Sequence, residues 1–144
     1  MLISTKGRYA LRLLVDVAQH QPPKGLVPLR DVAQRQDISE KYLESIAKLL
    51  VRSGFLSAQR GKGGGYRLAK PAEACSVKDI ISLVEGPLVP VSCLDPGAQP
   101  CPRSGSCCTH SLWRGLEATI LTYLDRFTLA DLMGKDQQGY DYVI

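Results

Sequence analysis

The sequence predicts a mainly helical protein: a winged helix-turn-helix with a two-stranded β wing, followed by a long C-terminal dimerisation helix. Three patterns support this fold class. Two short helical segments are joined by a tight turn, a glycine-rich hairpin follows them directly, and a long apolar stripe lies near the end of the chain. With 144 residues, of which 44% are hydrophobic, the chain can bury a modest core in one or two small domains.

The first two helices are placed by apolar spacing and by the residues that start and end them. Apolar residues at helical spacing predict a helix over 5–19, with Ser4 or Thr5 as its cap. The segment HQPPKG ends this helix, because Pro and Gly interrupt the pattern. Pro28 then opens a short helix that reaches Gln34, since proline is favoured in a first helical turn.

The next helix is amphipathic, and its polar face is basic. Ser39 is placed to cap it, and Gly54 stands just past its end, where a left-handed residue is expected. Two helices joined by a short turn predict a helix-turn-helix, in which the second helix enters the major groove of DNA. Helix pairs in ordinary bundles look similar, so this pattern alone does not settle the function. The outward polar residues are Lys41, Ser45, Lys48 and Arg52.

The segment FLSAQRGKGGGYRLAK, at 55–70, predicts two strands around a glycine-rich tip. Such a tip suits a close approach to a phosphate backbone or the insertion of an arginine into a minor groove. A nucleotide-binding phosphate loop is the rival interpretation, but it needs its lysine after the glycines and a helix beyond, whereas Lys62 precedes them and a strand follows. DNA binding is therefore favoured. The basic residues around the tip are Arg60, Lys62, Arg67 and Lys70.

The charge is unevenly distributed along the chain. Residues 1–70 carry 13 Lys and Arg against 5 Asp and Glu, a net charge of +8. Residues 71–144 carry 5 against 9, a net charge of −4. A basic first half suits a polyanion such as DNA, although basic faces are also common on ordinary solvated surfaces.

Other classes of protein are disfavoured by features that the sequence lacks. No apolar run approaches the roughly 18 residues of a membrane span, and the N-terminal segment interleaves charged and apolar residues, unlike a signal peptide. We therefore expect a cytoplasmic protein that does not contact a membrane. No acid–base pair or nucleophile elbow is recognisable, so the sequence predicts neither an enzyme nor a small-molecule substrate.

The second half predicts a short helix, a cysteine-rich loop and a long helix. Ser76 would cap the short helix, and Cys75 before it is expected to be a small buried residue. The long helix spans 109–133, and its apolar stripe suits either the core or a dimer interface. Helix-turn-helix proteins usually pair to contact two half-sites of DNA, so we expect a homodimer. The stripe consists of Trp113, Leu116, Ile120, Tyr123 or Leu124, and Phe127.

Four of the five cysteines lie at 93–108, in a segment rich in Pro, Gly and Ser. Such a segment forms no packed helix or strand, so another interaction must hold it. Seven residues separate the first two cysteines, five separate the second from the third, and a histidine follows three positions after the third. In a reducing compartment this pattern indicates metal or redox chemistry, and it leaves zinc, a disulfide and an iron–sulfur cluster open.

Four segments carry a resemblance to a known family: STKGRYALRLLVDVA, VPLRDVAQRQDISEKYLESIAKLL, GFLSAQRGKGGGYRLAK and CCTHSLWRGLEATILTYL. They resemble the IscR-type transcription regulators, a winged-helix family of iron–sulfur and redox sensors that includes NsrR and CymR. The resemblance covers roughly residues 1–133, and the wing with Arg60 and the C-x-T-H-x-L-W pattern at Cys107–Trp113 are its most specific parts. It implies a 2Fe–2S cluster with the ligands Cys93, Cys101, Cys107 and His110.

Several features of the chain bear on which branch of this family it resembles. IscR-like loops typically place five residues between the first two cysteines, where this chain has seven. Cys108 adds a thiol beside a predicted ligand and is an alternative to His110 as the fourth ligand. NsrR-like relatives complete their site with an acidic residue near the start of the first helix, where this chain has Arg8. CymR-like relatives lack the three cluster cysteines, so the resemblance favours an IscR-like site.

The sequence therefore predicts a transcription regulator whose binding to a double-stranded DNA operator is modulated by an iron–sulfur cluster. Its expected targets are genes of iron–sulfur assembly or of related iron and redox functions. A thiol- or nitric-oxide-responsive regulator of the same fold and a non-regulatory iron–sulfur carrier or scaffold are the alternatives. The residues expected at the DNA are Ser39, Lys41, Tyr42, Glu44, Lys48, Arg60 and Lys62, and the resemblance supports Ser39, Tyr42 and Glu44 among them.

The expected organisation has three parts. A DNA-binding domain is expected over 1–70. A linker helix, a cluster-binding loop at about 88–110 and a dimerisation helix are expected over 71–133. A flexible tail is expected over 134–144.

Overall fold

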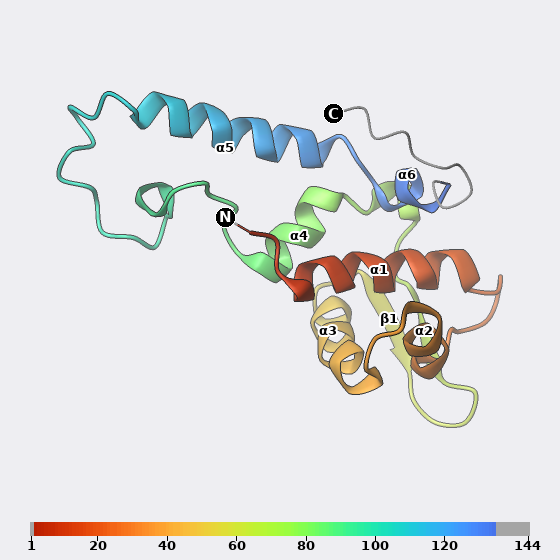
Figure 1. Cartoon of the computed structure of the whole chain (residues 1–144). Coiled ribbons are helices and arrows are strands. Elements are labelled where there is room, and N and C mark those ends of the chain that lie inside the picture. The colour runs from red at the N-terminus through yellow and green to blue at the C-terminus, as the bar shows by residue number, and fades with distance from the viewer. Residues whose placement is uncertain (1, 135–144) are drawn as a thin grey trace.

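The computed structural model describes residues 2–134, which are mainly helical with one two-stranded antiparallel sheet, as predicted (Figure 1). Beyond Gly134, the predicted flexible tail lies outside the described residues. Within the described part, no helix is both long and apolar enough to cross a membrane. The elements are α1 Thr5–His20, α2 Leu29–Gln36, α3 Glu40–Arg52, β1 Leu56–Gln59, β2 Gly65–Leu68, η1 Ala72–Ala74, α4 Val77–Glu85, η2 Ser92–Leu94, α5 His110–Asp125 and α6 Leu129–Met133.

Local capping chemistry starts and ends the helices close to the predicted positions. Ser4, Ser39 and Ser76 each accept a hydrogen bond from the backbone N–H three residues later, which satisfies a donor that the first helical turn leaves unpaired. Asp37, with a φ of 53°, ends α2 in the left-handed conformation and turns the chain toward α3. Gly54, with a φ of 80°, follows α3 in a conformation that glycine adopts without strain.

The wing is fixed to the helix-turn-helix by backbone hydrogen bonds. β1 and β2 pair antiparallel, and Val27, which precedes α2, forms an isolated bridge with Tyr66 of β2. The N–H of Val27 donates to the Tyr66 carbonyl at 2.8 Å, and the N–H of Tyr66 donates to the Val27 carbonyl at 2.9 Å. A Cβ at Gly65 would overlap the Val27 carbonyl, so the glycine permits this close approach.

α1 lies at the centre of the fold, with α2 and α3 on one side and α4 and α6 on the other (Figure 1). Its apolar residues enter one continuous core, which extends past residue 70, where we expected the DNA-binding domain to end. The division into domains stays a prediction. Fully buried members of this core are Leu13, Leu14, Val17, Val32, Leu43, Ile46, Leu50, Cys75, Ile80 and Leu129, which confirms the predicted burial of Cys75.

The single long helix predicted over 109–133 is wrong in one respect. The chain forms two helices there, α5 and α6, with a break at 126–128. At this break Thr128 forms an antiparallel bridge with Ser76, flanked by two backbone hydrogen bonds of 3.0 Å. Thr128 also caps α6 in a capping box with Asp131. These bonds replace the helical ones, because a residue paired with another strand cannot continue a helix.

α5 packs on the rest of the molecule through its C-terminal half. Its contacts with α4 belong to a second apolar cluster, in which Leu121, Leu124 and Phe127 pack around Val77, Ile81 and Leu88. Phe127, which we placed in the dimer stripe, therefore packs within the chain itself. No described residue of α5 is buried, and its large apolar side chains at the surface are Leu112, Leu116 and Tyr123, at 60%, 41% and 55% exposed.

Asp16 is the one charged residue buried among the described residues, and it ties α1 to α2. Its carboxylate accepts hydrogen bonds from Arg35 Nη2 at 2.6 Å, from Arg35 Nε at 3.1 Å and from Gln36 Nε2 at 2.9 Å. The hydrogen bond with Asp16 raises the pKa of Arg35 above its ordinary value. Because a buried carboxylate needs such partners, these contacts fix the position of α2 on α1.

We predict that Asp16→Ala lowers the free energy of unfolding by about 2 kcal/mol, because it leaves Arg35 and Gln36 facing an apolar gap. The expected loss is below that of a fully buried ion pair, since the Arg35 side chain is 34% exposed and regains water. Urea denaturation would measure the change. The matched control is Asp31→Ala, whose ion pair with Arg30 is 3.8 Å long and largely exposed, with an expected effect below about 0.5 kcal/mol. Equal losses in the two variants would contradict the assigned role of Asp16.

Candidate nucleic-acid interface and metal-binding loop

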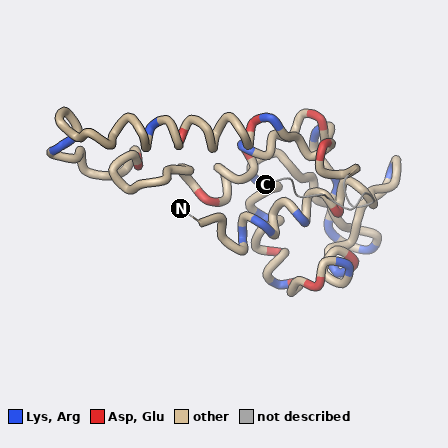
Figure 2. The backbone as a smooth tube through the Cα atoms, turned by 45° about the horizontal axis from the view of Figure 1, so that its top comes forward, with Lys and Arg blue, Asp and Glu red and all other residues tan. Residues whose placement is uncertain are grey.

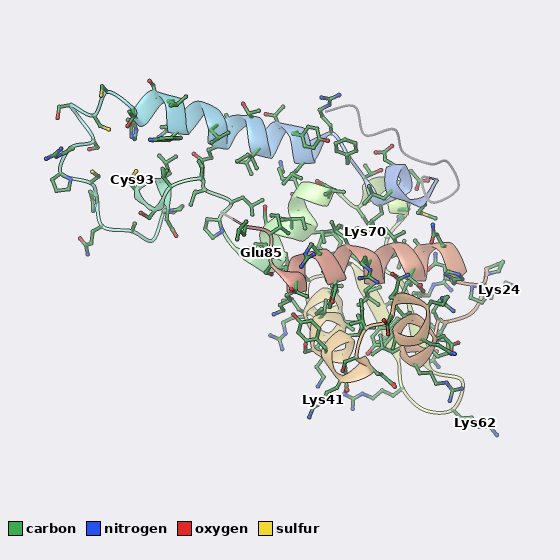
Figure 3. The ribbon with its side chains drawn as sticks, viewed as in Figure 1. Lys24, Lys41, Lys62, Lys70, Glu85 and Cys93 are labelled. Carbon is green, nitrogen blue, oxygen red and sulfur yellow. The ribbon has the colours of Figure 1, made fainter. Side chains whose placement is uncertain are left out.

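The outer face of α3 and the tip of the wing point to the same side of the molecule. Lys41, Glu44 and Lys48 are exposed on α3, while the residues between them at helical spacing are buried in the core. Figure 3 shows Lys41 and Lys62 at the same lower edge, although they belong to α3 and to the wing tip. The structure therefore brings together the two elements in which the sequence predicted DNA contacts.

Ser39 and Tyr42 also have structural contacts. The Ser39 hydroxyl accepts a hydrogen bond from the Tyr42 N–H at 3.4 Å as the cap of α3, and its own proton can still be donated outward. The Tyr42 ring is half-buried and packs edge-on against Tyr9 of α1, with ring centroids 5.8 Å apart. This packing fixes the start of α3 against α1, which gives the polar groups of the first turn a defined direction.

A groove separates α3 from the wing, and three cationic side chains contribute to its lining. Lys48 and Arg52 border it from α3, and Arg60 borders it from the wing. Tyr66 lies at its wall, where burial and the nearby Glu44 carboxylate raise the pKa of the phenol above its ordinary value. The phenol therefore stays protonated at neutral pH and can donate a hydrogen bond.

A second groove lies between α3 and the start of α1. It is lined by Lys6 of α1 and by Lys41, Lys48 and Arg52 of α3. Lys6 and Arg52 were missing from the predicted set of DNA-binding residues. Arg52 shares the outward face of α3 with Lys48, so helical periodicity could have included it. Lys6 has no such sequence signal, because its place beside α3 depends on how α1 packs.

Glu44 is the one acidic side chain that lines these two grooves. Its carboxylate lies 3.8 Å from the Lys48 ammonium, one helical turn away. A carboxylate on the DNA-facing side of a helix repels phosphates but can accept a hydrogen bond from the amino group of cytosine. Its position among cations therefore suits contact with a base edge and not with the backbone.

The wing tip contains the basic residues and the special glycines that the sequence predicted. Gly61 and Gly63 have φ angles of 95° and 76°, and the N–H of Gly64 donates to the Gly61 carbonyl at 2.9 Å. Arg60 and Lys62 are exposed on this turn. Figure 2 shows most Lys and Arg positions in the body that contains α1 to β2, with few along the cysteine loop and α5.

The cysteine loop, residues 87–109, extends beyond the start of α5, at the end of the molecule that lies away from the wing (Figure 1). Cys93 lies in η2 and is exposed, Cys101 and Cys107 are half-buried, and His110 is the first residue of α5. Most backbone hydrogen bonds within the loop close single turns between residues three apart. In the described part of the chain, no three Cys, His, Asp or Glu residues are grouped closely enough to hold a metal ion. The structure thus does not bring the predicted ligands together.

One of the predicted ligands has a chemical environment that favours the thiolate. The Cys107 Sγ lies 3.3 Å from the Thr109 hydroxyl. Hydrogen bonds from the Thr109 side chain and backbone, with a further one from the His110 backbone, lower the pKa of the Cys107 thiol. Thiolates are the form of cysteine that ligates metals.

The donor set of the loop fits an iron–sulfur cluster chemically. Such clusters are held mainly by cysteine thiolates, and histidine replaces cysteine in some 2Fe–2S centres. The loop also contains Pro, Gly and Ser in place of a packed apolar face, so its shape is open to being set by a bound group. Cys75, by contrast, is fully buried in the core, where burial raises the pKa of its thiol, and it lies outside this donor set.

The fold and the cationic face of α3 and the wing define a winged helix-turn-helix DNA-binding protein. Comparison with known proteins identifies its family. Residues 3–135 match the Rrf2 family, described as an iron-dependent transcriptional regulator, and the chain belongs to this family.

Curated relatives agree with the family assignment. The chain is 40% identical over 135 residues to the HTH-type transcriptional regulator IscR of Yersinia pseudotuberculosis, covering 94% of this chain and 80% of the relative. It is 39% identical over 137 residues to the regulator of the same name from Erwinia tasmaniensis, covering 95% of this chain and 81% of the relative. The predicted resemblance to IscR-type regulators is therefore confirmed.

Solved structures show the same fold. IscR of T. potens superposes with a TM-score of 0.73 at 32% identity, covering 99% of this chain and 95% of that one. CymR, titled the global cysteine regulator of B. subtilis, gives a TM-score of 0.75 at 34% identity, covering 93% of this chain and 97% of that one. These relatives confirm the winged-helix fold. The family assignment also confirms the prediction of a transcription regulator and not an enzyme.

We predict that Arg60→Ala weakens binding to the preferred operator by about 1–3 kcal/mol, because Arg60 stands beside the wing tip where a groove edge would lie. Lys62→Ala should weaken binding to all sequences alike and reduce the slope of log K against log salt by about 1, as the loss of one phosphate contact does. Fluorescence anisotropy with a selected operator and a scrambled duplex would measure both effects.

Lys24→Ala is the matched control for these variants. Lys24 lies in the loop between α1 and α2 and projects from the side of the molecule, away from the edge that carries Lys41 and Lys62 (Figure 3). Its loss should leave affinity and salt dependence close to those of the parent protein. An Arg60→Ala protein with unchanged operator affinity would exclude Arg60 as a groove contact.

Proposed function

We propose that this protein is a sequence-specific transcription regulator whose operator binding is modulated by a bound 2Fe–2S cluster. The cluster would be held by Cys93, Cys101, Cys107 and His110, and the target genes would serve iron–sulfur assembly or related iron and redox functions. One observation carries the proposal: the three predicted cysteine ligands lie on a single loop at the periphery of the fold, and His110 begins the helix that follows this loop.

The similarity to regulators named IscR and the iron-dependent description of the family support this choice of cofactor. A bound cluster supplies a redox-active centre that oxygen and other oxidants can alter. The loop supplies soft thiolate donors, and His110 at the start of α5 supplies an imidazole, which would be the more exchangeable donor because it carries no negative charge as a ligand. Cys93, Cys101 and Cys107 would then be the fixed anchors.

The proposed DNA contacts divide into base contacts and backbone contacts. Ser39, Tyr42 and Glu44, in the first turn of α3 and just beyond it, are the candidates for base edges in the major groove. Arg60 would enter the adjacent minor groove, where a narrow groove attracts arginine. The remaining cations would contact phosphates; they are Lys41, Lys48 and Lys62, joined by Lys6 and Arg52 from the geometry of the two grooves.

The proposed homodimer rests on the surface of α5. Leu112, Leu116 and Tyr123 are exposed on a helix of which only the C-terminal half packs on α4. Large apolar side chains spaced along an exposed helix favour burial against a second copy of the same helix. Such a pair would place two helix-turn-helix units for the two half-sites of a palindromic operator.

A thiol-responsive regulator without a cluster is the second candidate. The solved relatives include CymR, one of them titled as an oxidised form, and Cys93 and Cys108 of this chain are exposed. Anaerobic purification followed by an ultraviolet–visible spectrum and iron and sulfide analysis distinguishes the candidates, because a cluster is coloured and free thiols are not. Operator affinity is then compared between loaded and cluster-free protein, with an expected difference of about 5-fold or more. Colourless, iron-free protein with thiol-sensitive DNA binding would support the second candidate.

We predict that Cys93→Ala, Cys101→Ala and Cys107→Ala each yield colourless protein, since each removes a thiolate anchor. His110→Ala should leave a labile cluster or none. Cys108→Ala is the matched control and should leave the visible spectrum almost unchanged, because adjacent side chains rarely both face one small cluster. Anaerobic spectra and iron content would measure the outcome. If Cys108→Ala bleaches the protein and His110→Ala does not, Cys108 is the fourth ligand.

We predict that Leu116→Asp shifts the protein from dimer to monomer, because it places a charge in the proposed interface. Leu116 is already 41% exposed in the chain, so its replacement should not prevent folding. Sedimentation velocity at micromolar concentration would measure the mass, with circular dichroism as the check on folding. Ala74→Asp, an exposed change on η1, is the control that should stay dimeric. A parent protein that sediments as a monomer would refute the proposed dimer.

A further inference from the structure

Glu85, the last residue of α4, accepts two hydrogen bonds from Ser4, the residue that immediately precedes α1. Its Oε1 accepts from the backbone N–H of Ser4 at 3.0 Å and from the Ser4 hydroxyl at 2.5 Å. Ser4 is at the same time the N-cap of α1, whose hydroxyl oxygen accepts from the N–H of Gly7 at 3.2 Å. Figure 3 shows Glu85 beside the start of α1. One carboxylate oxygen thus joins the start of α1 to the end of α4, through two residues that lie 81 positions apart in the chain.

This arrangement has the chemistry of a capping box in which the acid comes from another helix. In an ordinary capping box, a Glu or Gln at the third helical position reaches back to the N–H of the N-cap residue. Here that third position is Gly7, which has no side chain. A Cβ at Gly7 would overlap Glu85 Oε1, so the glycine makes room for the carboxylate of α4. The positive end of the α1 dipole favours a negative group there.

The hydrogen bonds between Glu85 and Ser4 lie between the cysteine loop and the DNA-binding face of α3. The proposed effect of the cluster on DNA binding requires a physical connection between these two parts. Glu85 is followed by Gly86, with a φ of 79°, and then by the loop that carries the proposed ligands. On the other side, the first half of α1 packs against α3 through Tyr9 and Tyr42. Two residues separate Glu85 from Leu88, whose buried side chain holds the start of the loop, so a loop movement that shifts Leu88 also shifts Glu85. A shift of Ser4 in turn moves the helix on which α3 rests.

We propose that Glu85 is a positioning residue that transmits the state of the cysteine loop to the DNA-binding face through its two hydrogen bonds to Ser4. This inference rests on the proposed function, because it supplies the link between cluster and operator affinity. Glu85 is not a ligand in this scheme. It sets the position of α1, and α1 sets the position of α3.

The test compares operator affinity of cluster-loaded and cluster-free protein in a set of full-length variants. In the parent protein the two affinities should differ by about 5-fold or more. Glu85→Ala removes the acceptor, so the ratio should fall to within about 2-fold of unity while the visible spectrum is unchanged. Glu85→Gln keeps an oxygen in the same place for both Ser4 donors and should retain most of the parent ratio.

Gly7→Ala tests whether a change in the affinity ratio comes from loss of the contact between Glu85 and Ser4 or from a less stable α1. Its Cβ would displace the Glu85 side chain, whereas alanine favours a helix more than glycine does. Loss of the affinity ratio in both Glu85→Ala and Gly7→Ala cannot then be ascribed to a weaker helix. Glu73→Ala removes an exposed carboxylate of η1 and is the control that should keep the parent ratio.

The outcomes distinguish failure of this inference from failure of the proposed function. If the loaded and cluster-free parent proteins bind the operator equally, the cluster does not modulate binding, and both ideas are refuted. If the parent shows a clear ratio and Glu85→Ala keeps it, only the role of Glu85 is refuted. Loss of the cluster spectrum in Glu85→Ala would also refute it, because the residue would then act on the loop and not beyond it.

Discussion

The arrangement of the molecule depends on the burial of α1 on both sides. Leu13, Leu14 and Val17 are fully buried in the core, which α1 shares with the helix-turn-helix and with α4 and α6. Asp16 adds a directional constraint, because its buried carboxylate is satisfied only when Arg35 and Gln36 of α2 meet it. α3 and the wing thereby acquire a fixed position relative to α4. A movement at either end of α1 is transmitted through close packing, since protein interiors do not absorb shifts in voids.

The cysteine loop has no comparable constraint. Its start is held by Leu88, which is buried with Val77 and Ile81, and its end is held by the first turn of α5. Between these points the chain forms isolated turns, and the predicted ligands are not gathered. A segment whose own packing does not determine its shape is suited to control by a bound group, because few native contacts oppose the change. The same fold thus combines a closely packed DNA-binding part and a loop whose residues are mostly exposed.

The sequence predicted the features that depend on local chemistry. The serine caps, the left-handed Gly54 and the glycine-rich wing tip need only neighbouring residues, and the helical spacing of Lys41 and Lys48 placed them on the outer face of α3. Features that depend on distant segments were missed. The break at 126–128 comes from a bridge to Ser76, and the contribution of Lys6 follows from helix packing. The ligand set came from the resemblance and stays a prediction.

The net charge is unevenly distributed along the chain, and this favours one orientation of the protein toward DNA. The residues up to 70 carry a net charge of +8, whereas those after it carry −4. A duplex that approaches the protein is attracted to α3 and the wing, because the excess of positive charge lies in the part of the chain that forms them. The grooves on both sides of α3 then offer cations to the phosphates that border a major groove, with Glu44 between them. Under the proposed function, the cations would set the register through phosphate contacts and Glu44 would penalise wrong bases, so attraction and selectivity would come from different side chains of one helix.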